Sequence, residues 1–169
     1  KGANAQVQLQ DYRDLKGKFD GIVSIEMFEA VGERYWKAYF TKMKSLLANS
    51  GKAVIQTITM DDAHFDAYRK GGDAIRSYIF PGGMLPSPSR FHQEAERAGL
   101  QVVGSHAFGQ DYAKTLRMWL QKFDEKRDEI KAQGFDESFM RLWRYYLASC
   151  AGSFSAGRID VMQVELAHA

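Results

Sequence analysis

The stretch FDGIVSIEMFEAVGERYW, Phe19–Trp36, contains a short apolar run that ends abruptly in charged residues, and this run predicts the first strand of the fold. Gly21–Ile25 is apolar and partly β-branched, which is typical of a buried strand. Two carboxylates, Glu26 and Glu29, follow where the strand gives way to the next helix. Because the carboxyl ends of parallel strands line the ligand crevice in open sheets, we expect this junction to be functional.

The residues that follow predict a strand–helix–strand unit. Apolar residues from Tyr35 to Leu47 recur at helical spacing, and Asn49–Gly51 is a helix stop signal. The run KAVIQTIT, Lys52–Thr59, is rich in β-branched residues and predicts a second buried strand. A strand, a helix and a strand in this order favour a βαβ unit and therefore a parallel sheet.

The rest of the chain continues this alternation. Residues 60–90 include IFPGGMLPSPS and predict a long irregular region, which in a compact domain is usually functional. A short helix ending at Gly99, a strand over residues 100–108, two amphipathic helices and a final strand over residues 158–168 follow. A weak strand is expected near Val7 and Leu9. The pattern predicts a single three-layered α/β domain of about four strands.

The two amphipathic helices carry apolar stripes that we interpret as core packing. The stripes are Tyr112, Leu116, Trp119, Leu120 and Phe123 in one helix and Phe139, Leu142, Trp143, Tyr146, Leu147 and Cys150 in the other.

Composition excludes several classes of function. The net charge is +2 and no Lys/Arg block is interleaved with aromatic residues, so we expect no nucleic-acid partner. The single cysteine, Cys150, excludes an internal disulfide and fits a reducing cytoplasm. Its position on an apolar helix face, with no obvious base, makes it a poor nucleophile. No apolar run approaches a membrane span and no signal peptide is visible, so any membrane contact is expected to be peripheral. The four histidines lack paired ligand spacing, and we predict no metal site.

Six segments in series resemble the cyclopropane-fatty-acid synthase family, which includes the mycolic-acid cyclopropane synthases and uses S-adenosylmethionine. They are QDYRDL, FDGIVSIEMFEAVG, YFTKMKSLLANSGKAVIQTIT, YIFPGGMLPS, FGQDYAKTLRMW and YYLASCAGSF. The resemblance implies an α/β, doubly wound, Rossmann-like class I methyltransferase fold with inserted helices before the last strand. KGANAQVQLQ lacks the Gly-rich cofactor turn, so residues 1–169 resemble the C-terminal part of the catalytic domain.

Several expectations about binding follow from this resemblance. Cofactor contacts carried over to this sequence are Asp11 and Tyr12 in a loop and Ser24 and Ile25 at the strand end. We expect the fragment alone to bind S-adenosylmethionine weakly and to be inactive. Its first strand would be an unpaired sheet edge, which invites a homo-oligomer or pairing with the missing N-terminal part.

The resemblance also implies a bicarbonate ion beside the reaction centre. Its ligands carry over to Glu29, Tyr112, the backbone of Ile58 and Gln56, the last standing where relatives have His. A Gln amide donates a hydrogen bond but cannot shuttle a proton. Two further departures are Ala30, where relatives commonly have His, and Glu26, where they often have Gly. These departures leave the product open between a cyclopropane ring and a methyl-branched or methylene-bearing chain.

Purely structural roles remain open for these residues. Glu29 could simply favour the dipole of a helix first turn, and Tyr112 could be a core aromatic. Glu26 is either a solvated strand-end residue or a partner of the reacting groups. The segment Tyr78–Ser87 is either a connector or a lid over an acyl chain.

The sequence leaves three functions open. The first is methyl transfer to the double bond of an unsaturated fatty acyl lipid, in the cytoplasm or at the inner face of the membrane. The second is methyl branching or methylation of another apolar molecule, and the third is non-catalytic lipid or partner binding. The acyl carrier, phospholipid or protein, is not specified by the sequence.

Overall fold

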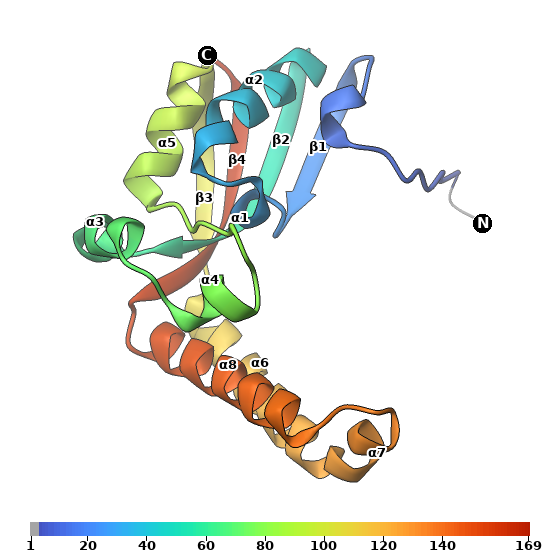
Figure 1. Ribbon diagram of the computed structural model, residues 1–169. Helices are drawn as coiled ribbons and strands as arrows, with labels where there is room; N and C mark the ends of the chain where they lie inside the picture. The colour runs from blue at the N-terminus through green and yellow to red at the C-terminus, as the bar shows by residue number, and fades with distance from the viewer. Residues whose placement is uncertain (1–3) are drawn as a thin grey trace.

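A computed structural model describes residues 4–169 as a sheet with helices packed along it (Figure 1). The strands β1 (Phe19–Ile25), β2 (Leu47–Met60), β4 (Ile159–His168) and β3 (Leu100–Ala107) lie side by side in that order. β1 and β2 are parallel, which confirms the predicted βαβ unit, whereas β4 runs antiparallel to both of its neighbours. β1 is therefore an edge strand within residues 4–169, as the sequence predicted.

The helices follow the predicted alternation with some additions. They are η1 (Tyr12–Asp14), α1 (Phe28–Val31), η2 (Glu33–Tyr35), α2 (Trp36–Leu46), α3 (Asp62–Lys70), α4 (Ala74–Tyr78), α5 (Pro88–Arg97), α6 (Gly109–Glu125), α7 (Arg127–Ala132) and α8 (Glu137–Ser155). Within residues 4–169, no helix combines the length and the apolar character that crossing a membrane requires.

One face of the sheet carries α2 and α5. α6 and α8 pack against Ile58 and Val161, whose side chains point to the other face, so helices lie on both faces as predicted, although the second face is covered only at one end. Both parallel connections, β1 to β2 and β2 to β3, step across the sheet in the same direction. Because such crossovers are right-handed, their helices fall on the same face. Val23 and Ile25, which point to the other face of β1, remain 69% and 54% exposed.

The main core is built around Phe28, which lies in the stretch Phe19–Trp36 and begins α1. Its ring stacks on Trp36 with centroids 5.3 Å apart, and it meets Tyr39 at 5.0 Å. Phe40 and Phe91 complete the cluster at 5.3 Å each. Phe28 thus joins α1 to α2 and α5 beneath the sheet.

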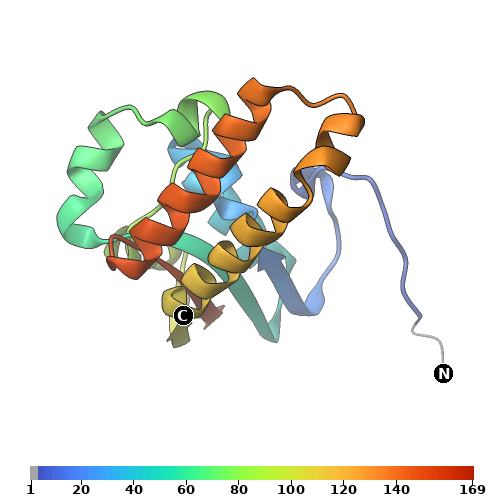
Figure 2. The same cartoon turned by 90° about the horizontal axis from the view of Figure 1, so that it is seen from below.

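A second core joins the helical arm to the sheet. α6 and α8 lie side by side as an antiparallel pair, which Figure 2 shows from below. Leu116 and Leu147 meet in this core together with Ile159 and Val161 of β4. The predicted stripe on α6 is wrong at Trp119, which is 53% exposed because it lies beyond the face that α8 covers.

Two other sequence predictions are wrong. Val7 and Leu9 lie in an extended, fully exposed segment without strand pairing, because no neighbouring strand of residues 4–169 lies beside them. Residues 60–90 contain α3 and α4 in place of a purely irregular region. Asp61 and Asp73 cap these helices by accepting from the backbone N–H groups of Ala63 and Arg76, and N-capping of this kind fixes helix starts.

We expect Phe28→Ala to lower the free energy of unfolding by about 3–5 kcal/mol, because it empties the centre of the main core. Urea unfolding of the full-length protein measures this change. Tyr78→Ala, at an exposed ring, is the control and should change stability by less than about 0.5 kcal/mol. A loss below about 1 kcal/mol for Phe28→Ala would contradict its central place in the core.

Candidate active site

The candidate site lies where β1 and β2 end. Ile25 pairs with Gln56 in the last register position of the parallel ladder. The backbone N–H of Glu26 then donates to the Gln56 carbonyl at 2.9 Å, which fixes the first residue after β1 against β2. Glu26 and Glu29 are thereby held at the carboxyl edge of the sheet, as the sequence predicted.

Only one oxygen of the Glu29 carboxylate is hydrogen-bonded. Its Oε1 accepts from the backbone N–H of Ile58 at 2.6 Å. Its Oε2 is buried and has no hydrogen-bond partner among residues 4–169. Burial raises the pKa of this carboxyl group, against the lowering effect of the Ile58 hydrogen bond. A buried acid with an unused oxygen is typical of a functional site.

The Glu26 carboxylate is the centre of a polar network across the sheet. Its Oε1 accepts from the Gln56 side-chain amide at 2.9 Å and from the Tyr112 hydroxyl. The Gln56 oxygen in turn accepts from the Gln163 amide at 2.9 Å. Burial, and then the bond to Glu26, raise the pKa of Tyr112, so its hydroxyl stays protonated and donates.

The backbone of Glu26 adopts an unusual conformation for this residue type. Its φ is +51°, and it is the one non-glycine residue with positive φ within residues 4–169. A left-handed backbone costs a side-chain-bearing residue about 1–3 kcal/mol, and glycine adopts it freely. A glutamate at this position is therefore kept at a cost in stability, which strained residues in ligand sites commonly show.

The predicted bicarbonate ligands are divided between these two carboxylates. Ile58 contacts Glu29, while Gln56 and Tyr112 contact Glu26. Ala30 lies on the exposed side of α1, next to Glu29. Sequence reasoning missed the link between Glu26 and Tyr112, which are 86 residues apart.

The predicted cofactor residues fall into two groups. The Tyr12 ring packs against Tyr39 with centroids 5.7 Å apart, and the Tyr39 hydroxyl donates to Ser24 Oγ at 2.8 Å. Ser24 thus keeps its own proton free to donate, while the half-exposed side chain of Ile25 points to the opposite face of β1. Asp11 instead pairs with Arg13, which lowers the pKa of the Asp11 carboxyl to about 2.

These groups fit an adenosyl cofactor in part. An aromatic ring, an apolar side chain and a hydroxyl at the end of a parallel strand are the chemistry that nucleoside binding uses. Tyr12 and Ser24 could therefore hold such a group on the face of β1 that α2 covers, and Ile25 could meet it from the other face at the strand end. The Asp11 carboxylate, in contrast, is engaged by Arg13 on both of its oxygens.

The segment Tyr78–Ser87 lies directly beside the acidic junction. The N–H of Met84 donates to the Glu29 carbonyl at 2.9 Å. Phe80 meets the Tyr146 ring of α8 edge-on, with centroids 5.9 Å apart. The segment therefore connects α1 to the helical arm, a position that suits a lid.

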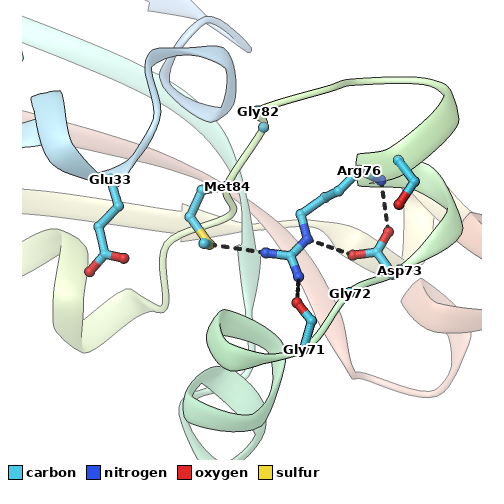
Figure 3. Close-up of a pocket in the computed structure, with 9 residues that line it drawn as sticks. Glu33, Gly71, Gly72, Asp73, Arg76, Gly82 and Met84 are labelled. Carbon is cyan, nitrogen blue, oxygen red and sulfur yellow. Dashed lines mark hydrogen bonds and ion pairs between the residues drawn. The ribbon is translucent and has the colours of Figure 1, made fainter.

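Arg76 ties this segment to the turn between α3 and α4, because its guanidinium contacts Met84 Sδ at 3.8 Å as well as residues of that turn, and sequence reasoning missed it. Figure 3 shows its guanidinium among Gly71, Asp73 and Met84 at the edge of a small pocket. It donates to the Tyr68 carbonyl at 2.9 Å, to the Asp73 carboxylate at 2.8 Å, and to the Gly71 carbonyl. The spacing of Asp73 and Arg76, an i,i+3 pair, was the available signal.

The remaining candidate residues for chemistry, two histidines and the cysteine, have contacts or burial that indicate structural roles. His64 pairs with Asp61, and His168 contacts the Leu47 carbonyl. Burial raises the pKa of the Cys150 thiol to about 11, so the thiol stays protonated and is a poor nucleophile. Within residues 4–169, no group of three His, Cys, Asp or Glu side chains is arranged to hold a metal ion.

Comparison with known proteins identifies the fold class and the family of this chain. The fold matches that of mycolic acid cyclopropane synthase CmaA1 in complex with SAH and CTAB, with a TM-score of 0.84 and 29% identity over 94% of this chain and 59% of that one. It is the Rossmann-like fold of class I S-adenosylmethionine-dependent methyltransferases. The family described as mycolic acid cyclopropane synthetase matches residues 1–164, and the chain belongs to this family.

Two curated relatives are similar across almost the whole chain. Tuberculostearic acid methyltransferase UfaA1 of Mycobacterium tuberculosis is 40% identical over 96% of this chain and 38% of its own length. Cyclopropane-fatty-acyl-phospholipid synthase of Escherichia coli K12 is 38% identical over 97% of this chain and 41% of its own length. The chain therefore spans about two fifths of the length of these relatives.

We expect Glu29→Gln to stabilise the full-length protein at pH 7. Because the folded-state pKa of Glu29 is raised, the unfolded state loses this proton first as pH rises, and stability falls through that window. Gln removes the buried charge, while its oxygen still accepts from Ile58. The gain should vanish below the ordinary pKa range of glutamate, and urea unfolding at pH 7 and pH 4 measures it. A variant less stable at pH 7 than the wild type would contradict this.

We expect Arg76→Lys to loosen the segment over residues 72–85, because an ammonium group cannot reach the three acceptors that the guanidinium bridges. Hydrogen exchange measured by mass spectrometry on the full-length protein should show roughly tenfold faster exchange there, as expected for the loss of about 1.4 kcal/mol of local stability. Arg97→Lys, at an exposed guanidinium that contacts Glu94 through a single nitrogen, is the matched control. Equal protection in both variants would show that Arg76 does not anchor the segment.

Proposed function

We propose that this chain carries part of the reaction centre of an enzyme that transfers a methyl group from S-adenosylmethionine to the double bond of an unsaturated fatty acyl chain. The observation that carries the proposal is the pair of carboxylates, Glu26 and Glu29, held with Tyr112 at the carboxyl edge of a sheet in a chain of this family. The names of the relatives, a fatty acyl phospholipid synthase and a tuberculostearic acid methyltransferase, support a lipid substrate.

The structure of a relative determined with SAH, the product that S-adenosylmethionine leaves after losing its methyl group, supports the choice of cofactor. S-adenosylmethionine supplies an electrophilic methyl group on a sulfonium. Tyr12, Ser24 and Ile25 would hold it in this chain, together with residues from the rest of the protein. Asp11 would join them through a rearrangement of its pair with Arg13.

An alkene is a weak nucleophile, so the protein must hold the acyl chain in place and exclude water from it. The apolar side chains of the segment Tyr78–Ser87 suit a lipid tail, and we infer that this segment is the lid. Its hydrogen bond to the Glu29 carbonyl would couple closure over the acyl chain to the position of the carboxylates.

The addition of a methyl cation to the double bond leaves a positive charge on the chain, and a base must then take a proton. Loss of a proton from the added methyl group gives a cyclopropane ring, or a methylene group after a hydride shift within the chain. A saturated methyl branch requires a hydride donor in addition. Glu29 and Tyr112 lie at the edge of the sheet where this chemistry would occur.

We expect the full-length protein to transfer a labelled methyl group from a donor carrying CD3 to a cis-unsaturated acyl phospholipid. Mass spectrometry distinguishes the products by mass and deuterium content: a ring or a methylene group keeps two deuteriums, a branch formed by direct hydride capture of the cation keeps three, and a branch formed by later reduction of the methylene group keeps two but is two hydrogens heavier. High-field proton signals then identify the ring. The acyl chain presented on a carrier protein is the parallel substrate.

Tyr112→Phe tests whether the transfer depends on this site. It removes the hydroxyl that donates to Glu26 and should lower turnover roughly tenfold to a hundredfold. Folded protein that binds the acyl lipid without transferring the label would favour the alternative, a non-catalytic lipid-binding module. Label found on another apolar small molecule, and absent from acyl chains, would replace the substrate class.

A further inference from the structure

We propose that the Glu26 carboxylate is the proton acceptor of this reaction, a base built into the chain that takes the place of a bound anion such as bicarbonate. The inference rests on the proposed function, because it assigns a role within the same methyl transfer. It is carried by the contacts of Glu26 with two neighbouring elements and by its backbone conformation.

The hydrogen bonds of Glu26 leave one oxygen committed and one oxygen free. Gln56 and Tyr112 both donate to Oε1. Among residues 4–169, no donor contacts Oε2, and the side chain is exposed at the sheet edge. The two donors on Oε1 restrain the carboxylate and leave Oε2 as the oxygen that can accept a proton.

Gln56 is itself held in place by Gln163. Because the Gln56 oxygen accepts from Gln163, its amide nitrogen must face Glu26. The bond thus orients the amide as a donor to a negative charge. An amide in this orientation serves an anion well and a neutral ligand less well.

Glu29 is less suited to take the proton. Its Oε1 is occupied by the Ile58 N–H, and its Oε2 is buried. The negative charge of Glu26 further raises the pKa of Glu29, because like charges near one another disfavour ionisation. Glu29 is therefore a positioning residue for α1 and the lid, and Glu26 is the accessible base.

A separate anion would have to compete with the two carboxylates for the same donors. Tyr112 and Gln56 already bind Glu26, and Ile58 already binds Glu29. A bicarbonate ion at this point would also face the negative charge of both glutamates. The left-handed backbone at Glu26 supports the same assignment, since a glycine would suit this conformation at no cost and the glutamate keeps a carboxylate there despite the strain.

The step balances without an oxidant or a reductant. After the methyl group has bonded to one carbon of the double bond, Glu26 Oε2 takes one proton from that methyl group. The electron pair of the broken C–H bond forms the new carbon–carbon bond and neutralises the cationic carbon. Glu26 becomes a neutral carboxylic acid, which later releases the proton to water.

The test uses the full-length enzyme and the CD3 assay with two substitutions of Glu26. Glu26→Gln keeps the acceptor of Gln56 and Tyr112 but cannot take a proton, and turnover should fall roughly a hundredfold or more with unchanged S-adenosylmethionine affinity. Glu26→Gly removes the side chain, fits the backbone and should fold well. Asp20→Asn, at an exposed acid on the strand that leads to Glu26, is the matched control and should keep wild-type turnover.

Chemical rescue separates a base from a structural residue. Formate should restore turnover of Glu26→Gly roughly tenfold, because the freed donors of Gln56 and Tyr112 can bind a small carboxylate, and it should not affect Glu26→Gln. Removing dissolved carbon dioxide and bicarbonate should leave the wild-type rate unchanged.

Three results would overturn the proposal: more than a tenth of wild-type turnover in Glu26→Gln, no response of Glu26→Gly to formate, or a wild-type rate that falls without bicarbonate. In each case the wild-type enzyme still transfers the CD3 group when bicarbonate is present. This separates failure of the acceptor from failure of the proposed function, in which the wild type transfers no methyl group and both proposals fall.

Discussion

The parallel pairing of β1 with β2 is the constraint on which the site depends. The ladder ends at Ile25 and Gln56, and one further backbone hydrogen bond ties Glu26 to the same residue of β2. Because side chains alternate along a strand, a slip of one residue would turn Gln56 to the other face of the sheet and separate it from the Glu26 carboxylate. The position of the chemistry is thus set by backbone geometry before any side chain is considered.

The short helix α1 converts this geometry into two different environments for adjacent residues. Phe28 is buried at the centre of the aromatic core, while Glu29 turns its carboxylate toward Ile58 of β2. The same turn accepts the hydrogen bond from Met84 of the lid segment. The packing of one aromatic ring therefore fixes the position of a carboxylate and of the segment beside it.

The sequence predicted the parts of this arrangement that local patterns control. The β-branched runs around Val23 and Val54 indicated parallel strands. The family resemblance, and no local pattern, grouped Glu29 with the backbone of Ile58, and the two are hydrogen-bonded in the structure. The helices at Asp61 and Asp73 were missed because their caps are short polar signals inside a Gly- and Pro-rich region. The contact between Glu26 and Tyr112 depends on how α6 packs across the sheet edge, and no local pattern encodes that distance.

The two carboxylates gain distinct roles from their surroundings. Glu29 is largely buried against the backbone of β2, where its Oε1 ties α1 to Ile58, whereas Glu26 is hydrogen-bonded on one oxygen and open on the other. Pairs of acids in contrasting environments commonly divide the tasks of a site in this way. If the acceptor is part of the protein, its position relative to the acyl chain is fixed by the backbone of Glu26. The choice between a ring and a methylene group depends on whether a hydride shift precedes loss of the methyl proton, and it would then be set by how the lid seats the acyl chain against that fixed oxygen.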